Sequence, residues 1–177
     1  MNNEKDNVYD LVEDFYAHDE GWNTLLRQEY AEGFLRMEAW KGKKNSDLYR
    51  SWDNLTMLCL YLGSAETFLG DMNADDFIDC IAWCGRNISE FTPDYKNTQD
   101  FLETCDGLFK YLKGKNAISN DTVPATAAEI LLQEGKMNII LPDGSFDEAN
   151  AERAWNATPD IPAKNIFKYW RAPAGIA

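Results

Sequence analysis

Large apolar residues recur every three or four positions along most of this chain, and that spacing constrains the fold more than any other feature. Leu48, Trp52, Leu55, Cys59 and Leu62 form one such series. Side chains three and four residues apart share one face of an α-helix, so each series predicts a helix that buries one stripe. Comparable series occupy residues 8–16, 22–40, 77–84, 101–112 and 130–132.

Glycines and capping residues mark the ends that we predict for these helices. Lysines around Gly42 place positive charge at the end of the second helix, where a glycine can adopt the cap conformation. Ser46 and Asn73 are suited to cap the next two helices at their amino-terminal ends. Gly63 and Gly85 are expected to end the helices that precede them.

The sequence therefore predicts an all-α fold, an irregular bundle of about five to seven helices. With 177 residues, of which 45% are hydrophobic, the chain is expected to form one helical domain over residues 1–135. Residues 136–177 read as a loop-rich C-terminal strap packed on the same domain. Residues 138–147 could form a short β-hairpin, because a β-like run precedes a Pro-Asp-Gly turn.

The formal net charge of −13 limits the classes of partner. Such a surface repels phosphate backbones, so we expect no nucleic-acid binding. No apolar run has the length that a membrane span needs, and residues 1–6 lack the pattern of a secretory signal. We therefore expect a cytoplasmic protein without a membrane partner.

The four cysteines, Cys59, Cys80, Cys84 and Cys105, lie within the apolar helical series. We expect them to be buried, reduced and unpaired, as small hydrophobic side chains are. Paired zinc knuckles with two-residue gaps are absent from the sequence, so no metal site is expected at the cysteines.

The common catalytic motifs are missing from the sequence, which favours a protein that is not an enzyme. There is no glycine-rich phosphate loop, nucleophile elbow or HExxH motif. The only histidine, His18, is followed by two acidic residues and reads as a solvated side chain. A triad or a multi-histidine metal site is therefore not expected. The leading interpretation is a non-catalytic protein-interaction or accessory module without a cofactor.

Two pairs of carboxylates supply the alternative interpretation. Glu29 and Glu32 lie three residues apart in one predicted helix, and Asp76 and Asp79 lie three apart in another. Facing pairs from two helices could hold Mg²⁺ through oxygen ligands. The pattern resembles the all-α nucleoside triphosphate pyrophosphohydrolases, whose motif joins an E-x-x-E pair to an E-x-x-D pair. Here the second pair begins with Asp. The resemblance implies a Mg²⁺-dependent phosphate hydrolase.

A second resemblance is one of layout. An acid-rich helix start, a short link and the phrase Leu108–Gly114 occur within residues 69–118. This arrangement is similar to a segment of uncharacterised bacterial helical proteins akin to the plasmid pRiA4b ORF-3 group. The resemblance implies helices and carries over no functional residues.

The C-terminal segment combines aromatic and basic residues, unlike the rest of this acidic chain. Phe167, Tyr169, Trp170 and Arg171 are of the types enriched at protein interfaces. They are our sequence-based candidates for partner binding or self-association. The other interpretation is that this segment folds back on the acidic helices of its own chain.

We predict that truncation after Ala163 lowers the melting temperature, or abolishes dimerisation if the segment docks on a second chain. Burial of Phe167 and Trp170 would each contribute about 1.5–3 kcal/mol, which truncation would remove. Thermal denaturation and native mass measurement check this. Unchanged stability and mass, with fast amide exchange over residues 165–171 of the full chain, would contradict it.

Overall fold

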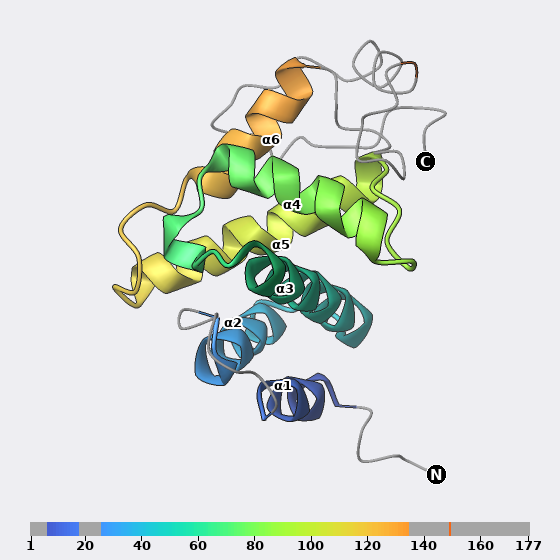
Figure 1. Cartoon of the computed structure of the whole chain (residues 1–177). Coiled ribbons are helices and arrows are strands. Elements are labelled where there is room, and N and C mark those ends of the chain that lie inside the picture. Colours follow the sequence, from blue (N-terminus) through green and yellow to red (C-terminus); the bar gives the residue numbers. More distant parts are fainter. Residues whose placement is uncertain (1–6, 18–25, 135–148, 150–177) are drawn as a thin grey trace. The chain divides into compact units, whose positions relative to one another are not determined.

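The computed structural model describes residues 7–17, 26–134 and 149 (Figure 1). Within these ranges it contains six α-helices, one short 3-10 helix and no strand. In chain order the elements are α1 Val8–Tyr16, α2 Gln28–Trp40, α3 Asn45–Ala65, η2 Leu69–Asp71, α4 Ala74–Asn87, α5 Tyr95–Gly114 and α6 Val123–Gln133. The predicted all-α class is confirmed. None of the described helices has the length and hydropathy that crossing a membrane requires.

Several predictions fall on residues outside the described ranges. These are the hairpin at residues 138–147, the C-terminal strap and its aromatic segment, and the solvated role of His18. The predicted boundary between residues 135 and 136 lies there too. Each of them stays a prediction.

The chain forms two compact units that alternate along the sequence. Unit 1 comprises residues 1–71 and 107–121, and unit 2 comprises residues 72–106 and 122–177. Helix α5 contributes its first part to unit 2 and its last part to unit 1. Each unit has apolar residues of its own that are buried.

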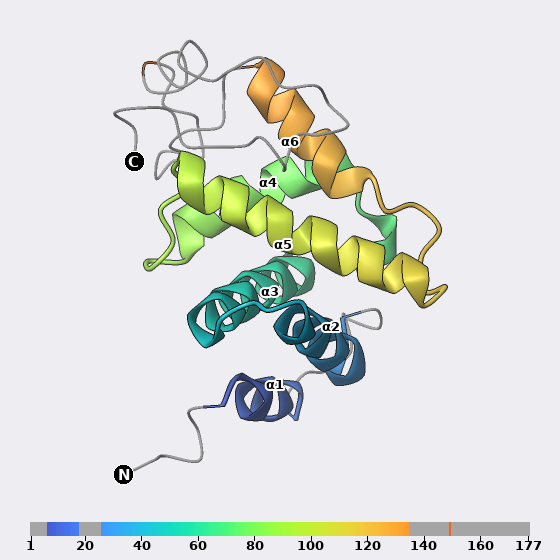
Figure 2. The same ribbon diagram turned by 180° about the vertical axis from the view of Figure 1, so that it is seen from behind.

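Unit 1 is built on α1, α2 and α3, which contact one another in pairs (Figures 1 and 2). The apolar stripe of α3 is buried along its length, as the spacing predicted. Phe15 of α1 packs edge-on against Trp52 of α3, with 5.4 Å between the ring centroids. The fully buried large side chains of this unit include Leu26, Phe34, Leu35, Leu55, Leu58 and Leu62.

Two glycines allow α2 and the last part of α5 to approach closely within unit 1. A Cβ atom on Gly33 would lie 2.2 Å from the hydroxyl oxygen of Tyr111. A Cβ on Gly107 would lie 3.1 Å from the ring of Phe34. The rings of Phe34 and Tyr111 are themselves neighbours, with centroids 6.2 Å apart. The small size of these two glycines is therefore part of the core.

Unit 2 packs α4 against α6, with the first part of α5 completing its core. Phe77 and Ile81 of α4 are fully buried, and so are Tyr95 and Phe101 of α5. The predicted cap at Asn73 is confirmed: its side chain accepts a hydrogen bond from the Asp76 backbone N–H (3.0 Å). The Asp76 carboxylate in turn accepts from the Asn73 N–H (2.8 Å), which completes a capping box.

Four predicted helix ends are wrong. Helix α2 begins at Gln28 after the extended residue Arg27, later than the series from residue 22 predicted. Helix α3 begins at Asn45 after Lys44, and Ser46 does not cap it. The same helix continues through Gly63 to Ala65, and α4 continues through Gly85 to Asn87. A glycine costs a helix only about 1 kcal/mol, so each of these helices can continue for two more residues beyond it.

We expect Gly33→Ala to destabilise the protein by about 1–2 kcal/mol, because steric overlap with Tyr111 outweighs the better helix propensity of alanine. Chemical denaturation measures this. Gly63→Ala is the matched control: no atom lies within 4 Å of its added Cβ, so it should stabilise α3 by up to about 1 kcal/mol.

The double variant Gly33→Ala/Tyr111→Phe tests whether overlap with the Tyr111 hydroxyl causes the destabilisation expected for Gly33→Ala. Removing the hydroxyl should make the double variant more stable than the sum of the two single effects indicates. Additive effects, or stabilisation by Gly33→Ala alone, would show that the close approach does not constrain this position.

Candidate functional site

Helices α2 and α3 of unit 1 are joined by a short turn with a defined backbone. The N–H of Gly42 donates to the Ala39 carbonyl (3.0 Å), and the N–H of Lys43 donates to the Glu38 carbonyl (3.2 Å). Gly42 has a φ of 94°, a conformation that favours glycine. These are the features of a Schellman motif, which satisfies the last carbonyls of a helix. The predicted role of Gly42 at the end of this helix is confirmed.

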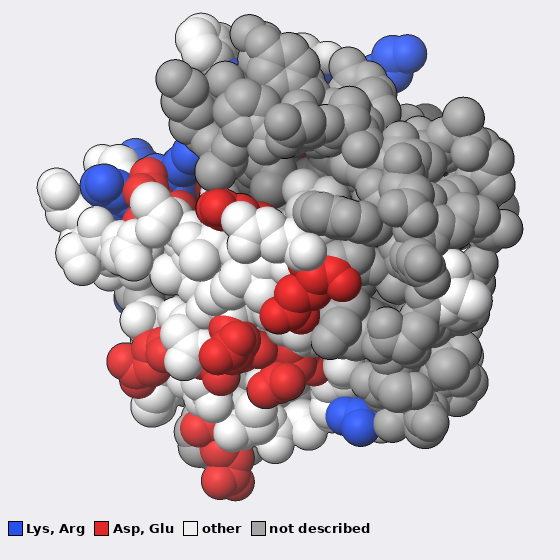
Figure 3. Space-filling model, turned by 90° about the horizontal axis from the view of Figure 1, so that it is seen from above, with Lys and Arg blue, Asp and Glu red and all other residues white. Residues whose placement is uncertain are grey.

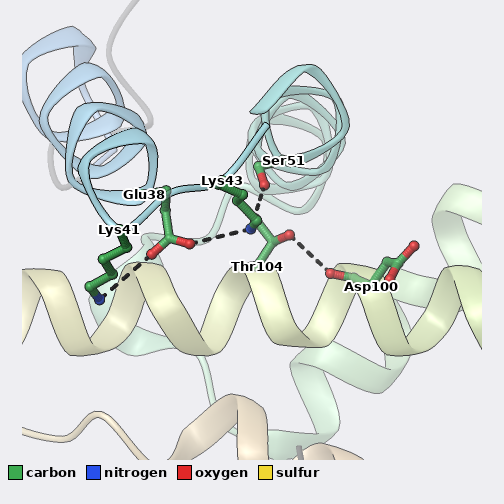
Figure 4. Close-up of polar contacts among 6 residues, drawn as sticks. All are labelled: Glu38, Lys41, Lys43, Ser51, Asp100 and Thr104. Atoms are coloured by element: carbon green, nitrogen blue, oxygen red, sulfur yellow. Dashed lines mark hydrogen bonds and ion pairs between the residues drawn. The ribbon is translucent and has the colours of Figure 1, made fainter. Parts of the chain in front are cut away.

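A polar network of side chains holds the same turn. Figure 4 shows Lys43 reaching between Glu38 of α2 and Ser51 of α3. Its Nζ lies 3.3 Å from Glu38 Oε2 and donates to Ser51 Oγ at 3.1 Å. Ser51 is 2% exposed, so this contact reaches the buried face of α3. Lys41 lies 3.8 Å from the other oxygen of Glu38. Backbone and side chains together fix the geometry of the turn.

Trp40 is the last residue of α2 and is 88% exposed. As the last member of the apolar series over residues 22–40 it was predicted to lie on the buried stripe, and that prediction is wrong. At about 100° per residue, Trp40 lies roughly 120–140° around the helix from Phe34 and Leu35, which are buried. The indole therefore projects into solvent from a fixed backbone. We call residues 40–44 the Trp40 turn.

The charge around the Trp40 turn has the opposite sign to that of the whole chain. Residues 36–44 carry four cationic side chains and one carboxylate, whereas the chain has a net charge of −13. Arg36 lies over the ring of Tyr9, 4.0 Å from its centroid, and 3.5 Å from Glu32. Lys41 and Lys44, which follow Trp40 in the same turn, are exposed. An exposed tryptophan and exposed ammonium groups thus share one rigid turn.

Outside residues 36–44, acidic side chains outnumber basic ones. On the face of the molecule drawn in Figure 3, Asp and Glu outnumber Lys and Arg among the residues described. This distribution agrees with the strongly negative net charge. The Trp40 turn differs from it in both charge and apolar character.

The candidate carboxylates lie in different units, and three of the four make local contacts. Glu29 forms an ion pair with Arg27, and Glu32 forms one with Arg36. In unit 2, Asp76 belongs to the capping box described above, and Asp79 is exposed. Among the described residues, no group of three or more histidine, cysteine or acidic side chains is arranged to hold a metal ion. The structure thus adds nothing in favour of the predicted Mg²⁺ site.

The cysteines are buried and none of the four forms a disulfide, as predicted. Cys59 lies 3.3 Å from the hydroxyl of Tyr16 in unit 1. In unit 2, burial raises the pKa of the Cys80 thiol well above its usual value, and a hydrogen bond with Cys84 raises it further. Burial also raises the pKa of Cys105, with smaller contributions from Cys84 and Asp106. Cys80 and Cys105 are therefore neutral packing groups, since reactive cysteines need accessible thiolates.

The aromatic candidates of the C-terminal segment lie outside the described residues. Phe167, Tyr169, Trp170 and Arg171 therefore stay predictions. The Trp40 turn is a site that the sequence reasoning missed. The signal was present: helical geometry places Trp40 away from Phe34, and the lysines follow it directly.

No model of a known protein family, no curated protein and no solved structure matches this chain.

We expect Lys43→Met to destabilise the protein by about 1–2 kcal/mol, because Glu38 and buried Ser51 both lose the ammonium group. Lys44→Met is the control: it removes one exposed lysine of the same turn and should change stability by less than about 0.5 kcal/mol. Urea denaturation of both variants measures the difference. Equal effects would mean that the network does not hold the turn.

We also expect Cys80 and Cys105 to resist alkylation by iodoacetamide in the native protein at mildly alkaline pH, and to react after denaturation. Peptide mass spectrometry checks this. Because folding raises both pKa values, the folded protein holds these protons at a pH where the unfolded chain releases them. Stability should therefore fall as the pH rises above the ordinary thiol value, about 8.5. Rapid labelling without denaturant would contradict their burial.

Proposed function

We propose that this protein is a non-catalytic protein-interaction module that docks a partner protein on the Trp40 turn. The observation that carries the proposal is the 88% exposure of Trp40 on a turn with a fixed backbone. Tryptophan is among the residues most enriched at energetic hot spots of protein interfaces. The proposal extends the leading interpretation of the sequence to a specific surface.

A partner that covers the side chain of Trp40 would gain free energy of binding. A tryptophan side chain buries roughly 150–250 Å² when it is covered, and each Å² of apolar surface contributes about 25 cal/mol. Trp40 stays exposed in the folded chain, so folding does not gain this free energy of burial. The Schellman motif and the Lys43 network order the turn before a partner arrives, so binding would cost little conformational entropy.

The aromatic C-terminal segment remains a proposed second contact, for a partner or for self-association. Phe167, Tyr169, Trp170 and Arg171 support this through their residue types alone. The Mg²⁺-dependent hydrolase stays the alternative function. It ranks second because Asp76 has a structural role in the capping box and both glutamates have arginine partners.

The test compares Trp40→Ala with Leu60→Ala. Leu60 is another exposed apolar residue of unit 1, at 48% exposure, and controls for loss of exposed apolar surface alone. Proteins retained from a cell lysate by the wild type and by Leu60→Ala, but not by Trp40→Ala, would be identified by mass spectrometry. The purified partner would then be titrated against all three.

We expect Trp40→Ala to weaken that binding by about 2 kcal/mol or more, roughly thirtyfold, with stability unchanged within about 0.5 kcal/mol. Equal retention by all three proteins would overturn the proposed docking surface.

A further inference from the structure

We propose that the occupant of the Trp40 turn is a short acidic segment of a partner protein that carries at least one large apolar side chain. This inference rests on the proposed function and adds the chemistry of the partner. It follows from the combination of one exposed indole and exposed ammonium groups on a rigid turn.

Charge complementarity defines the sign of the partner. Lys43 is held between Glu38 and Ser51, and Arg36 lies against Glu32 and Tyr9, so these two cations are engaged within the chain. Lys41 and Lys44 are exposed, and with respect to the described carboxylates only Lys41 lies near one, at 3.8 Å from Glu38. Carboxylates of a partner can therefore approach both lysines, while its apolar side chain covers the indole. A basic segment would meet repulsion at this turn.

The extent of the apolar surface defines the size of the partner's contact. Besides Trp40, the large apolar residues that are exposed in the described chain are Leu60 and Phe68. Leu60 follows Lys44 by sixteen positions, and a helix rises about 1.5 Å per residue, so it lies roughly 24 Å along α3 from the turn. The turn therefore offers one aromatic anchor with a charged rim. This suits a short peptide segment better than the broad apolar interface of an obligate dimer.

A nucleic acid is the other polyanion that could combine stacking on tryptophan with contacts to lysine. Its negative charge repeats along its whole length, whereas the protein has a net charge of −13, so a long strand would meet net repulsion beyond the turn. A short acidic peptide places its negative charges at the turn and avoids that repulsion. The observations thus favour the peptide.

The experiment uses the full chain and a phage-displayed library of random short peptides. Selection on the wild type, with binders to Trp40→Ala removed, yields peptides that depend on the indole. We expect these peptides to be enriched in Asp and Glu around an apolar residue. Synthetic copies are then titrated by fluorescence anisotropy, together with copies in which Asn and Gln replace the acids.

The variant Lys41→Glu/Lys44→Glu should weaken binding of the acidic peptides by about tenfold or more. Leu60→Ala should leave it unchanged, and the Asn and Gln copies should bind weakly. Added salt should weaken the acidic peptides more than the uncharged copies. Circular dichroism and thermal denaturation establish that each variant folds.

Other outcomes overturn the inference and separate it from the proposed function. Trp40-dependent peptides that are neutral or basic would leave the docking surface standing and refute the acidic partner. If no peptide depends on Trp40, both fail. A labelled oligouridylate that binds only when Trp40 is present would assign the turn to nucleic acid. Concentration-dependent dimerisation that Trp40→Ala abolishes would assign it to a second copy of the chain.

Discussion

Burial of one apolar stripe per helix is the constraint on which the rest of the structure depends. Each described helix buries an apolar stripe, and its exposed residues lie away from that stripe. The stripe on α2 passes through Ala31, Phe34 and Leu35. The helix ends at Trp40, where it has turned past that stripe, and the indole therefore faces solvent. The exposure of Trp40 thus follows from its angular position relative to the buried stripe of α2.

The end of α2 is determined by backbone chemistry and by one lysine. Gly42 supplies a conformation that other residues rarely adopt, and this closes the helix immediately after the indole. Lys43 then links Glu38 of α2 to Ser51 of α3, so the turn cannot swing independently of the two helices. A partner would meet Trp40 at a fixed position relative to Lys41.

Features that depend on local chemistry could be predicted from the sequence. Features that depend on packing between helices could not. The cap at Asn73 and the turn at Gly42 follow from the residues themselves, and both were predicted. Gly63 was wrongly expected to end α3, because a glycine lowers helix propensity by only about 1 kcal/mol and the helix continues to Ala65. Trp40 was misplaced because it ends the apolar series over residues 22–40 but lies about 120° around the helix from buried Phe34. The Lys43 network joins two helices in space, which no spacing rule along one helix reveals.

The position of Trp40 outside the core separates stability from recognition in this protein. Tyr111 packs on Gly33 and neighbours Phe34, so changing its ring alters the fold and any activity together. The indole of Trp40 has no such role, because 88% of it remains in solvent. Its free energy of burial becomes available only when another molecule covers it. The net charge of −13 would repel an acidic partner from most of the chain. At the Trp40 turn the local charge is positive, and the indole is exposed. An acidic partner would therefore gain both electrostatic attraction and apolar contact there.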